Sequence, residues 1–391
     1  MNVLVTGANG FVGKNLTQRL STIKDHRDRT RPALHIEEIL LCTRDTSAET
    51  LADYCKKANF VVHLAGVNRP QDPGEFTVGN TDFTRTLLEM LLESGNRCPV
   101  LLSSSIQASL TGRYAGSPYG QSKKAAEKLL LAYGKEAGAA GIIYRLPNLF
   151  GKWCRPNYNS VVATFCHNIA AGLPVQVRDP AFSLPLVYID DVVEALVGVL
   201  EGRSLPDPER PGYFAIAPVH EATLGWLADT IRSFADSRAT LQVPDLSDPL
   251  TKKLYSTYLS YLEPERGFKY PLEMHEDARG SFTEFLRSPD RGQVSVNVSR
   301  PGIVKGNHWH DTKNEKFLVV SGRACIRFRR PDGDTVYEYH VCGDKLEVVD
   351  IPTGYTHSIE NEGEGDLVTV MWANECFDPD RPDTWFLPVE G

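Results

Sequence analysis

The stretch Val5-Thr6-Gly7-Ala8-Asn9-Gly10-Phe11-Val12-Gly13 decides the fold of the first half of this 391-residue chain. It follows an apolar run, residues 2–6, and opens a helical pattern at Phe11. Glycines at positions 7, 10 and 13 leave the backbone bare where a tight turn meets a helix N-terminus, and such a terminus can hold a pyrophosphate. The motif therefore predicts a dinucleotide-binding turn. A glycine turn without a ligand is the alternative for the motif taken alone.

Outward from this turn, short apolar runs alternate with helical patterns. This alternation predicts a parallel sheet with helices on both faces, an α/β Rossmann-type fold. Between Arg44 and Phe60 we expect only a short or irregular element. We expect strands at 2–6, 39–43, 60–64 and 100–104, and helices from residue 11, at 82–93 and at 119–137.

The character of the sequence changes in the last third of the chain. From Gly280 onward, short β-rich runs are separated by Gly, Pro and Asp turns such as Pro331-Asp332-Gly333, a pattern typical of an antiparallel sandwich or barrel. We therefore predict a nucleotide-binding domain over residues 1–249, a helical connector over 250–270 and an all-β domain over 271–391.

Composition restricts the partners. With 24% charged and 41% hydrophobic residues and a net charge of -8, the chain is expected to be globular and to bind neither nucleic acid nor an anionic membrane. No apolar run approaches the roughly 20 residues of a membrane span, and the N-terminus opens on a strand instead of a signal peptide. The eight cysteines form no C-x-x-C pair, which suggests reduced thiols. We expect a cytoplasmic protein with a small-molecule substrate.

The motif Tyr119-Gly-Gln-Ser-Lys123 suggests proton transfer. Residues four apart share a helix face, so Lys123 can lie beside the Tyr119 hydroxyl, lower its pKa and make it an acid or base near neutral pH. Ser105, the last residue of Ser103-Ser104-Ser105, would hold a carbonyl oxygen by a hydrogen bond. Ser103 or Ser104 could take that role instead. For the motif alone, an ordinary surface helix is the alternative.

Together, the glycines, the segment His63-Leu64-Ala65-Gly66, Asn80, the serines and the Tyr-x-x-x-Lys motif resemble the short-chain dehydrogenase/reductase family. This resemblance implies Ser105, Tyr119 and Lys123 as the catalytic residues. Arg44, after the second strand, favours NADPH, while Asp45 beside it leaves NADH open. The implied cofactor contacts are Gly7, Gly10, Phe11, Gly13, Arg44, Leu64, Ala65, Asn80, Tyr119 and Lys123.

Two further segments, 145–151 and 186–191, resemble the extended branch of that family, whose members act largely on nucleotide sugars. The resemblance implies that Asn148 lies near the nucleotide. Members of this branch often hold the diphosphate with an arginine just before the second segment, where this chain has Ser183-Leu184-Pro185. Arg155 and Arg178 are the nearest arginines that could replace it, and the alternative is that both are ordinary surface charges. Ser105 is followed by Ile-Gln and not by the Asp-Glu pair of the family's dehydratases, which favours carbonyl reduction.

Four side chains in the last third suggest a metal site. His308 and His310 stand two apart in a predicted strand and point the same way, and Glu315 and His357 would arrive from neighbouring strands. Three imidazoles and a carboxylate suit a divalent ion, with zinc or iron leading, and leave positions open for a substrate.

The segments 302–322 and 352–361 resemble the two sequence motifs of the cupins, which implies an all-β cupin barrel; a metal-free cupin is the alternative. The segment 277–284 resembles the opening of the deoxysugar-nucleotide epimerases, cupins that act on 4-keto sugars. That resemblance implies substrate contacts by Arg279 and Glu284, to which we add Lys305. Those epimerases use a histidine base at the place of His308, which here is committed to metal. A tyrosine acid is also replaced, by Phe377.

A C4 ketone acidifies the proton on C3, and a metal on that oxygen would stabilise the enediolate. The base stays open among Lys305, Lys316, Tyr355 and Glu284.

From end to end the chain resembles the bifunctional capsule and O-antigen enzymes of the CapF type, an extended short-chain reductase fused to a zinc cupin. The resemblance implies that the cupin epimerises C3 of UDP-2-acetamido-2,6-dideoxy-4-hexulose. The reductase would then reduce C4 with NADPH to UDP-2-acetamido-2,6-dideoxy-L-talose, on the way to UDP-N-acetyl-L-fucosamine. The alternatives are a single-function reductase whose cupin only binds or dimerises, and a metal oxygenase. A homodimer is expected because cupins commonly exchange strands.

Overall fold

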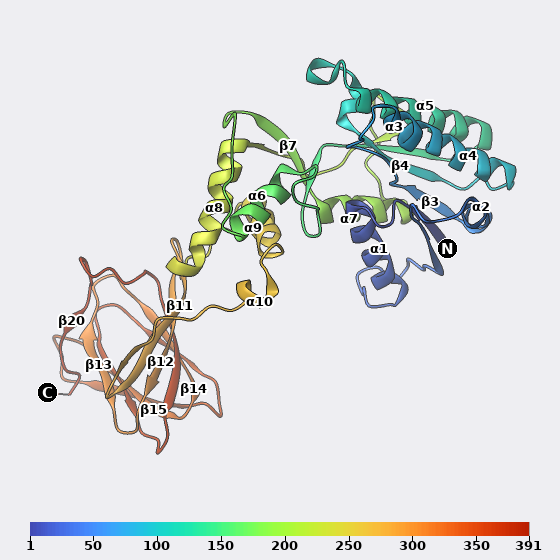
Figure 1. Ribbon diagram of the computed structural model, residues 1–391. Coiled ribbons are helices and arrows are strands. Elements are labelled where there is room, and N and C mark those ends of the chain that lie inside the picture. Colours follow the sequence, from blue (N-terminus) through green and yellow to red (C-terminus); the bar gives the residue numbers. More distant parts are fainter. Residues whose placement is uncertain (391) are drawn as a thin grey trace. The chain divides into compact units, whose positions relative to one another are not determined.

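The computed structural model describes residues 1–390, apart from the side chain of Arg266, and it divides into two compact units (Figure 1). The first comprises residues 1–231 and 253–262, and the second comprises 232–252 and the chain from 263 onward. This division differs from the expected connector over 250–270. The reason is burial: Leu254 and Tyr258 of α9 (Pro249–Leu259) are buried, and Lys253 pairs with Asp191 of the first unit.

The first unit is built on a parallel sheet, as expected. Its six strands lie in the order β2-β1-β3-β4-β5-β8, and every pairing between neighbours is parallel. The carboxyl ends of such strands meet at one edge, where α/β proteins bind their ligands. The strands are β1 (Asn2–Thr6), β2 (Glu38–Cys42), β3 (Phe60–His63), β4 (Val100–Ser105), β5 (Gly141–Leu146) and β8 (Tyr213–Phe214).

Helices cover both faces of this sheet (Figure 1). One face packs against α1 (Phe11–Lys24) and α7 (Ile189–Leu200), and the other packs against α2 (Ala48–Lys57), α4 (Phe83–Glu93) and α5 (Pro118–Ala137). The remaining elements of the unit are α3 (Gly74–Phe76), the π-helix η1 (Thr77–Asp82), the 3₁₀ turns η2 (Ile106–Ser109) and η3 (Gly112–Tyr114), α6 (Val161–Ala170), the start of α8 (Leu224–Thr240), and a small sheet of β6 (Asn148–Phe150), β7 (Ser183–Tyr188) and β9 (His220–Thr223).

Helix α2 corrects the sequence analysis, which expected only a short or irregular element between Arg44 and Phe60. The Ser47 hydroxyl caps the helix by accepting a hydrogen bond from the Thr50 backbone N–H. Only Leu51 and Cys55 of its ten residues are fully buried. Half of its residues are polar or charged (Glu49, Thr50, Asp53, Lys56 and Lys57), so the segment has no apolar run of the kind that marked the neighbouring elements.

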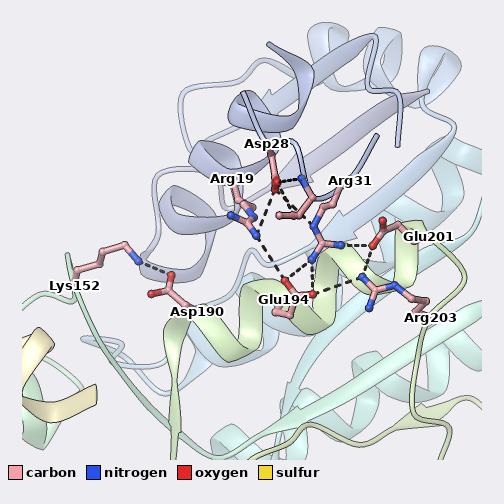
Figure 2. Close-up of polar contacts among 9 residues, drawn as sticks. Arg19, Asp28, Arg31, Lys152, Asp190, Glu194, Glu201 and Arg203 are labelled. Carbon is pink, nitrogen blue, oxygen red and sulfur yellow. Dashed lines mark hydrogen bonds and ion pairs between the residues drawn. The ribbon is translucent and has the colours of Figure 1, made fainter. Parts of the chain in front are cut away.

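A buried arginine ties the segment between α1 and β2 to α7 (Figure 2). Arg31 is only 7% exposed, and its guanidinium contacts Glu194 of α7 and Glu201, the C-cap residue of that helix, and lies 3.7 Å from Asp28. Burying a charge is unfavourable unless the charge is paired, so these carboxylates are what allow the segment to pack.

From residue 275 onward the second unit is all-β, as expected for the C-terminal part; its earlier residues include the rest of α8 and the first residues of α9. Two antiparallel sheets, in the orders β10-β11-β12-β19-β14-β17 and β16-β15-β18-β13-β20, enclose one apolar core that includes Phe317, Ile326 and Ile359. The strands are β10 (His275–Asp277), β11 (Gly280–Ser288), β12 (Gly292–Ser299), β13 (Val304–Trp309), β14 (Glu315–Ser321), β15 (Arg323–Arg329), β16 (Val336–Cys342), β17 (Val348–Ile351), β18 (Thr356–Asn361), β19 (Leu367–Ala373) and β20 (Trp385–Phe386); the short α10 (Pro264–Gly267) precedes them.

All eight cysteines are free thiols. Within residues 1–390, no helix combines the length and the apolar character that a bilayer crossing requires.

Candidate functional site

The glycine turn lies at the carboxyl end of β1. Gly7 has a φ of +67°, and a Cβ there would lie 2.7 Å from the Ala65 backbone nitrogen, while a Cβ on Gly13 would collide with the Gly7 carbonyl. Helix α1 begins at Phe11, and its cap residue Gly10 supplies no side-chain hydrogen bond. The N–H groups of this first turn therefore suit an anionic ligand such as a pyrophosphate.

The end of β3 closes against this turn. The Thr6 hydroxyl oxygen lies 2.6 Å from Nδ1 of His63 and accepts a hydrogen bond from the Ala65 backbone N–H, so the turn and the β3 end are joined. Leu64 and Ala65 are half-buried there, next to Gly7. Arg44 is exposed directly after β2, with Asp45 beside it.

Asn80 and Lys123, far apart in sequence, meet at Gly66. A Cβ on Gly66 would lie 2.6 Å from Oδ1 of Asn80 and 2.9 Å from Nζ of Lys123. The Asn80 amide donates to the Val67 carbonyl and to the Ser122 hydroxyl. The structure thus brings two of the expected cofactor contacts to one point on the sheet edge.

The three serines at the end of β4 have different partners. The Ser103 carbonyl accepts a hydrogen bond from the Lys123 ammonium at 3.0 Å, and the Ser104 hydroxyl donates to the buried Glu127 carboxylate at 2.6 Å. The Ser105 hydroxyl accepts a hydrogen bond from the Gln107 backbone N–H at 3.2 Å and lies near enough to Tyr119 to lower the pKa of the phenol. Of the three hydroxyls, the geometry therefore favours Ser105 beside the tyrosine.

The pKa values differ from the sequence expectation. Burial raises the pKa of Tyr119 to about 12, and the Ser105 hydrogen bond opposes this only in part. The predicted lowering of this pKa by Lys123 is wrong for this structure, in which the ammonium binds the Ser103 carbonyl and lies 6.0 Å from the Tyr119 ring centre. Burial also lowers the pKa of Lys123 to about 8. A protonated phenol suits an acid that gives its proton to a carbonyl oxygen.

Glu127 is a residue that the sequence analysis missed. It is 0% exposed, lies one turn beyond Lys123 on α5, and accepts hydrogen bonds from Ser104, Arg145 and Tyr213. These partners come from β4, β5 and β8, so one carboxylate joins α5 to three strands. The spacing in the sequence could have revealed Glu127. Tyr119, Lys123 and Glu127 are four residues apart and therefore lie on one helix face.

The expected substrate contacts have protein partners in the structure. The Asn148 amide donates to the Pro185 carbonyl at 3.1 Å. Arg279 is exposed and pairs with Asp277, and Glu284 pairs with Arg287. The Lys305 ammonium donates to Oδ1 of Asn297 at 2.6 Å and to the Val298 carbonyl at 2.9 Å.

The four expected metal ligands come together in the second unit. Ligand atoms of His308, His310, Glu315 and His357 all lie within 4.8 Å of one another. Strand register explains the convergence, because His308 pairs directly with His357 between β13 and β18. Glu315 opens β14 on the facing sheet, and its Oε2 lies 3.5 Å from Nε2 of His357.

Several polar atoms of this cluster are buried without a hydrogen-bond partner among the described residues: Nε2 of His310, Oε2 of Glu315 and both ring nitrogens of His357. Unpaired buried polar atoms are unfavourable, and a coordinated cation would satisfy them. Nδ1 of His310 lies 2.5 Å from the Asp383 carbonyl, a contact of the kind that orients metal-ligating histidines. The donor set therefore fits a divalent ion.

One candidate base faces away from this cluster. Lys316 follows Glu315 in β14, so its side chain points to the opposite face of the sheet, where it pairs with Asp350 and is exposed. Lys316 remained among the candidate bases in the sequence analysis because the sequence alone does not show which face of this strand points inward. Lys305 is half-buried, and burial lowers its pKa.

The parallel sheet, the glycine turn and the Ser105, Tyr119 and Lys123 group define the first unit as a short-chain dehydrogenase/reductase type of NAD(P)-binding domain. Residues 3–210 match the NAD dependent epimerase/dehydratase family, and residues 275–385 match the polysaccharide biosynthesis C-terminal domain. The chain belongs to the NAD dependent epimerase/dehydratase family, and its two-domain architecture is that of the CapF type.

Three relatives support this assignment. The crystal structure of the capsular polysaccharide assembling protein CapF from Staphylococcus aureus is 49% identical, with full coverage of both chains and a TM-score of 0.89. CapF with the inhibitor 3-isopropenyl-tropolone is 48% identical over both full chains, with a TM-score of 0.84. The UDP-2-acetamido-2,6-beta-L-arabino-hexul-4-ose reductase of Pseudomonas aeruginosa is 42% identical over 100% of this chain and 99% of its own.

Proposed function

We propose that the protein carries out two successive steps on one nucleotide sugar. The second unit would epimerise C3 of UDP-2-acetamido-2,6-dideoxy-4-hexulose, and the first would reduce the C4 ketone with NADPH to UDP-2-acetamido-2,6-dideoxy-L-talose, on the way to UDP-N-acetyl-L-fucosamine. The observation that carries this proposal is that a chain 42% identical, end to end, to a UDP-sugar 4-ketose reductase places Ser105 near Tyr119 in one unit and gathers four metal-ligating side chains in the other.

In the reduction, Tyr119 gives its proton to the C4 oxygen. Its raised pKa keeps the phenol protonated at neutral pH, and Ser105 is placed to hold the same oxygen. NADPH supplies the hydride when bound at the glycine turn, and the exposed Arg44 would contact its 2′-phosphate. NADH is the alternative because Asp45 stands beside Arg44.

In the epimerisation, the chain must remove and return a proton at C3. The neighbouring ketone acidifies that proton, and a zinc or iron ion on His308, His310, Glu315 and His357 supplies Lewis-acid polarisation of the ketone oxygen when bound. Because Lys316 points outward, the base is to be sought among Lys305, Tyr355 and Glu284.

The reductase half is tested by following NADPH oxidation with the 4-keto sugar. The wild type should oxidise NADPH, and Tyr119→Phe should lose at least a hundredfold in kcat because the proton donor is gone. Tyr114→Phe, which removes a hydroxyl from the short turn η3, is the matched control and should keep its activity. Absence of oxidation in the wild type and Tyr119→Phe alike contradicts the proposal.

The epimerase half is tested by deuterium uptake at C3 from heavy water without NADPH. His308→Ala should abolish uptake, whereas Tyr119→Phe and the exposed-histidine control His275→Ala should keep it. No uptake in the wild type supports the second candidate function, a reductase whose β unit only binds or dimerises. A requirement for dioxygen would indicate an oxygenase instead.

Metal analysis of the purified protein identifies the ion, and loss of one equivalent in His308→Ala would assign it to this cluster. We further propose that the protein is a cytoplasmic homodimer, which sedimentation at several concentrations tests.

A further inference from the structure

A second cluster of metal-ligating side chains lies on the outer face of the sheet β16-β15-β18. Cys325 of β15 pairs with His340 of the edge strand β16, and Glu362 follows the last residue of β18. The Glu362 backbone N–H donates to the Arg323 carbonyl, so the pairing with β15 continues to this residue. Three strands therefore contribute one ligand-type side chain each.

These side chains converge. One ligand atom from each of the three residues lies within 4.8 Å of the other two, and Nδ1 of His340 is 3.0 Å from Oε2 of Glu362. Cys325 is 0% exposed and forms the floor of the cluster, whereas His340 is 64% exposed in its side chain and forms its outer wall.

The cluster is separate from the His308 site. Ala324 and Ile326, the neighbours of Cys325 in β15, point into the apolar core, so the Cys325 side chain points to the other face of the strand. The His308 cluster lies on the inner side, where Phe328 of β15 approaches His357 at 6.5 Å between ring centres.

The surroundings favour a cation. Glu338 and Glu360 flank Cys325 on the neighbouring strands, and one guanidinium, that of Arg327, pairs with both. With Glu362, three carboxylates thus lie near the thiol, against two arginines, Arg323 and Arg327, on the same face of β15. This balance attracts a divalent ion, and the sulfur ligand selects against magnesium and calcium.

We propose that Cys325, His340 and Glu362 bind a thiophilic divalent ion of the zinc type, which joins the edge strand β16 to β15 and β18. Binding would form one metal–sulfur, one metal–nitrogen and one metal–oxygen bond, and the thiol proton would pass to solvent. Solvent would complete a tetrahedral sphere. Nothing in this assignment depends on the enzymatic activity.

The test uses cobalt(II) as a spectroscopic substitute for zinc in the full-length, chelator-stripped protein. A thiolate ligand gives cobalt a sulfur-to-metal charge-transfer absorption in the near ultraviolet, which the His308 cluster, having no sulfur, does not give. We expect the wild type to bind two cobalt equivalents and to develop this absorption with one of them. Calorimetric titration with zinc should show the same stoichiometry.

Variants assign the signal. Cys325→Ser should lose the absorption and one equivalent, whereas His357→Ala should lose one equivalent but keep the absorption. Cys342→Ser, on β16 two residues from His340, is the matched control and should keep both. Cys325 is buried, so its replacement could disturb the fold, whereas His340 is exposed. His340→Ala therefore serves as a second variant that leaves the core intact, and it should weaken cobalt binding at least tenfold.

A single equivalent without charge-transfer absorption would overturn the proposal. Absorption that survives Cys325→Ser but not Cys342→Ser would overturn it as well, by assigning the thiolate to the other cysteine. Because the readout is metal binding, a failure of the proposed enzymatic function would leave these results unchanged.

Discussion

Buried titratable residues of the first unit have their protonation states set by what surrounds them. His63 is 1% exposed, its ring nitrogens lie 2.6 Å from Thr6 Oγ1 and 2.9 Å from Thr84 Oγ1, and burial lowers its pKa to about 3. The neutral ring is therefore part of the folded structure, and it joins the glycine turn to α4.

The His63 shift predicts a pH dependence of stability. Between pH 6.5 and about 3 the His63 ring is protonated in the unfolded chain and neutral in the folded chain. The contribution of His63 to the free energy of unfolding is therefore complete above pH 6.5 and falls as the pH drops. The slope for one such group is about 1.4 kcal/mol per pH unit. Urea unfolding at pH 7.5 and 5 should show a smaller loss in His63→Gln than in the wild type. Equal losses in both proteins would contradict this assignment.

Glu127 is the second residue whose surroundings predict an effect. Its charge raises the pKa of Lys123, against the larger lowering by burial. In Glu127→Gln the ammonium should therefore lose its proton at a lower pH, and the alkaline limb of the kcat/KM profile for NADPH-dependent reduction should move toward acid. The same change at the exposed Glu136 of α5 is the control and should leave the profile in place. If Glu127→Gln lowers kcat/KM equally at every pH and leaves the alkaline limb where it is, then Glu127 has only a structural role.

Packing between elements depends on one arginine where the segment after α1 meets α7. The Arg31 guanidinium is surrounded by Asp28, whose side chain is 5% exposed, by Glu194 of α7 and by Glu201 at the C-cap of α7 (Figure 2). Leu34 and Ile36 of the same segment are buried in the sheet core, so the segment is attached by both charge and apolar contact.

Replacing Arg31 by Met should lower the free energy of unfolding by about 3 kcal/mol, the lower part of the range for breaking a buried pair, because Glu194 is half exposed. Arg27→Met removes an exposed arginine of the same segment, which pairs with the exposed Asp25, and should cost less than about 1 kcal/mol. Denaturant unfolding of both variants measures the difference. Similar losses of unfolding free energy in the two variants would show that burial does not determine how much Arg31 contributes to stability.

At the scale of the whole molecule, each unit has its own core and its own candidate site. No residue of the His308 cluster belongs to the first unit, and none of Ser105, Tyr119 and Lys123 belongs to the second. The two proposed reactions should therefore be separable in one polypeptide.

Metal removal tests this separation. A chelator should abolish deuterium uptake at C3 while leaving NADPH binding, followed by fluorescence titration, unchanged. The reciprocal change is Gly13→Val, whose Cβ meets the Gly7 carbonyl, and it should abolish NADPH binding while uptake continues. Loss of both properties from either change would show that the sites depend on each other.

The sequence by itself determined the features that depend on residues close together in the chain. These are the glycines at 7, 10 and 13 at one turn and helix start, Tyr119 with Lys123 on one helix face, and His308 with His310 at the end of one strand, where His310 directly follows β13. The same periodicity predicted an α/β domain followed by an all-β domain. It missed α2 because half of the residues of that short helix are polar or charged.

Only the tertiary structure decided the features that depend on pairing between distant segments. Strand order and register decided four such features. They are the hydroxyl beside Tyr119, the link from Glu127 to Arg145 and Tyr213, the outward orientation of Lys316, and the meeting of Cys325 with His340 and Glu362. A shift of one residue in register turns a strand's side chains to the opposite face, and local sequence patterns alone do not show which strands will be neighbours.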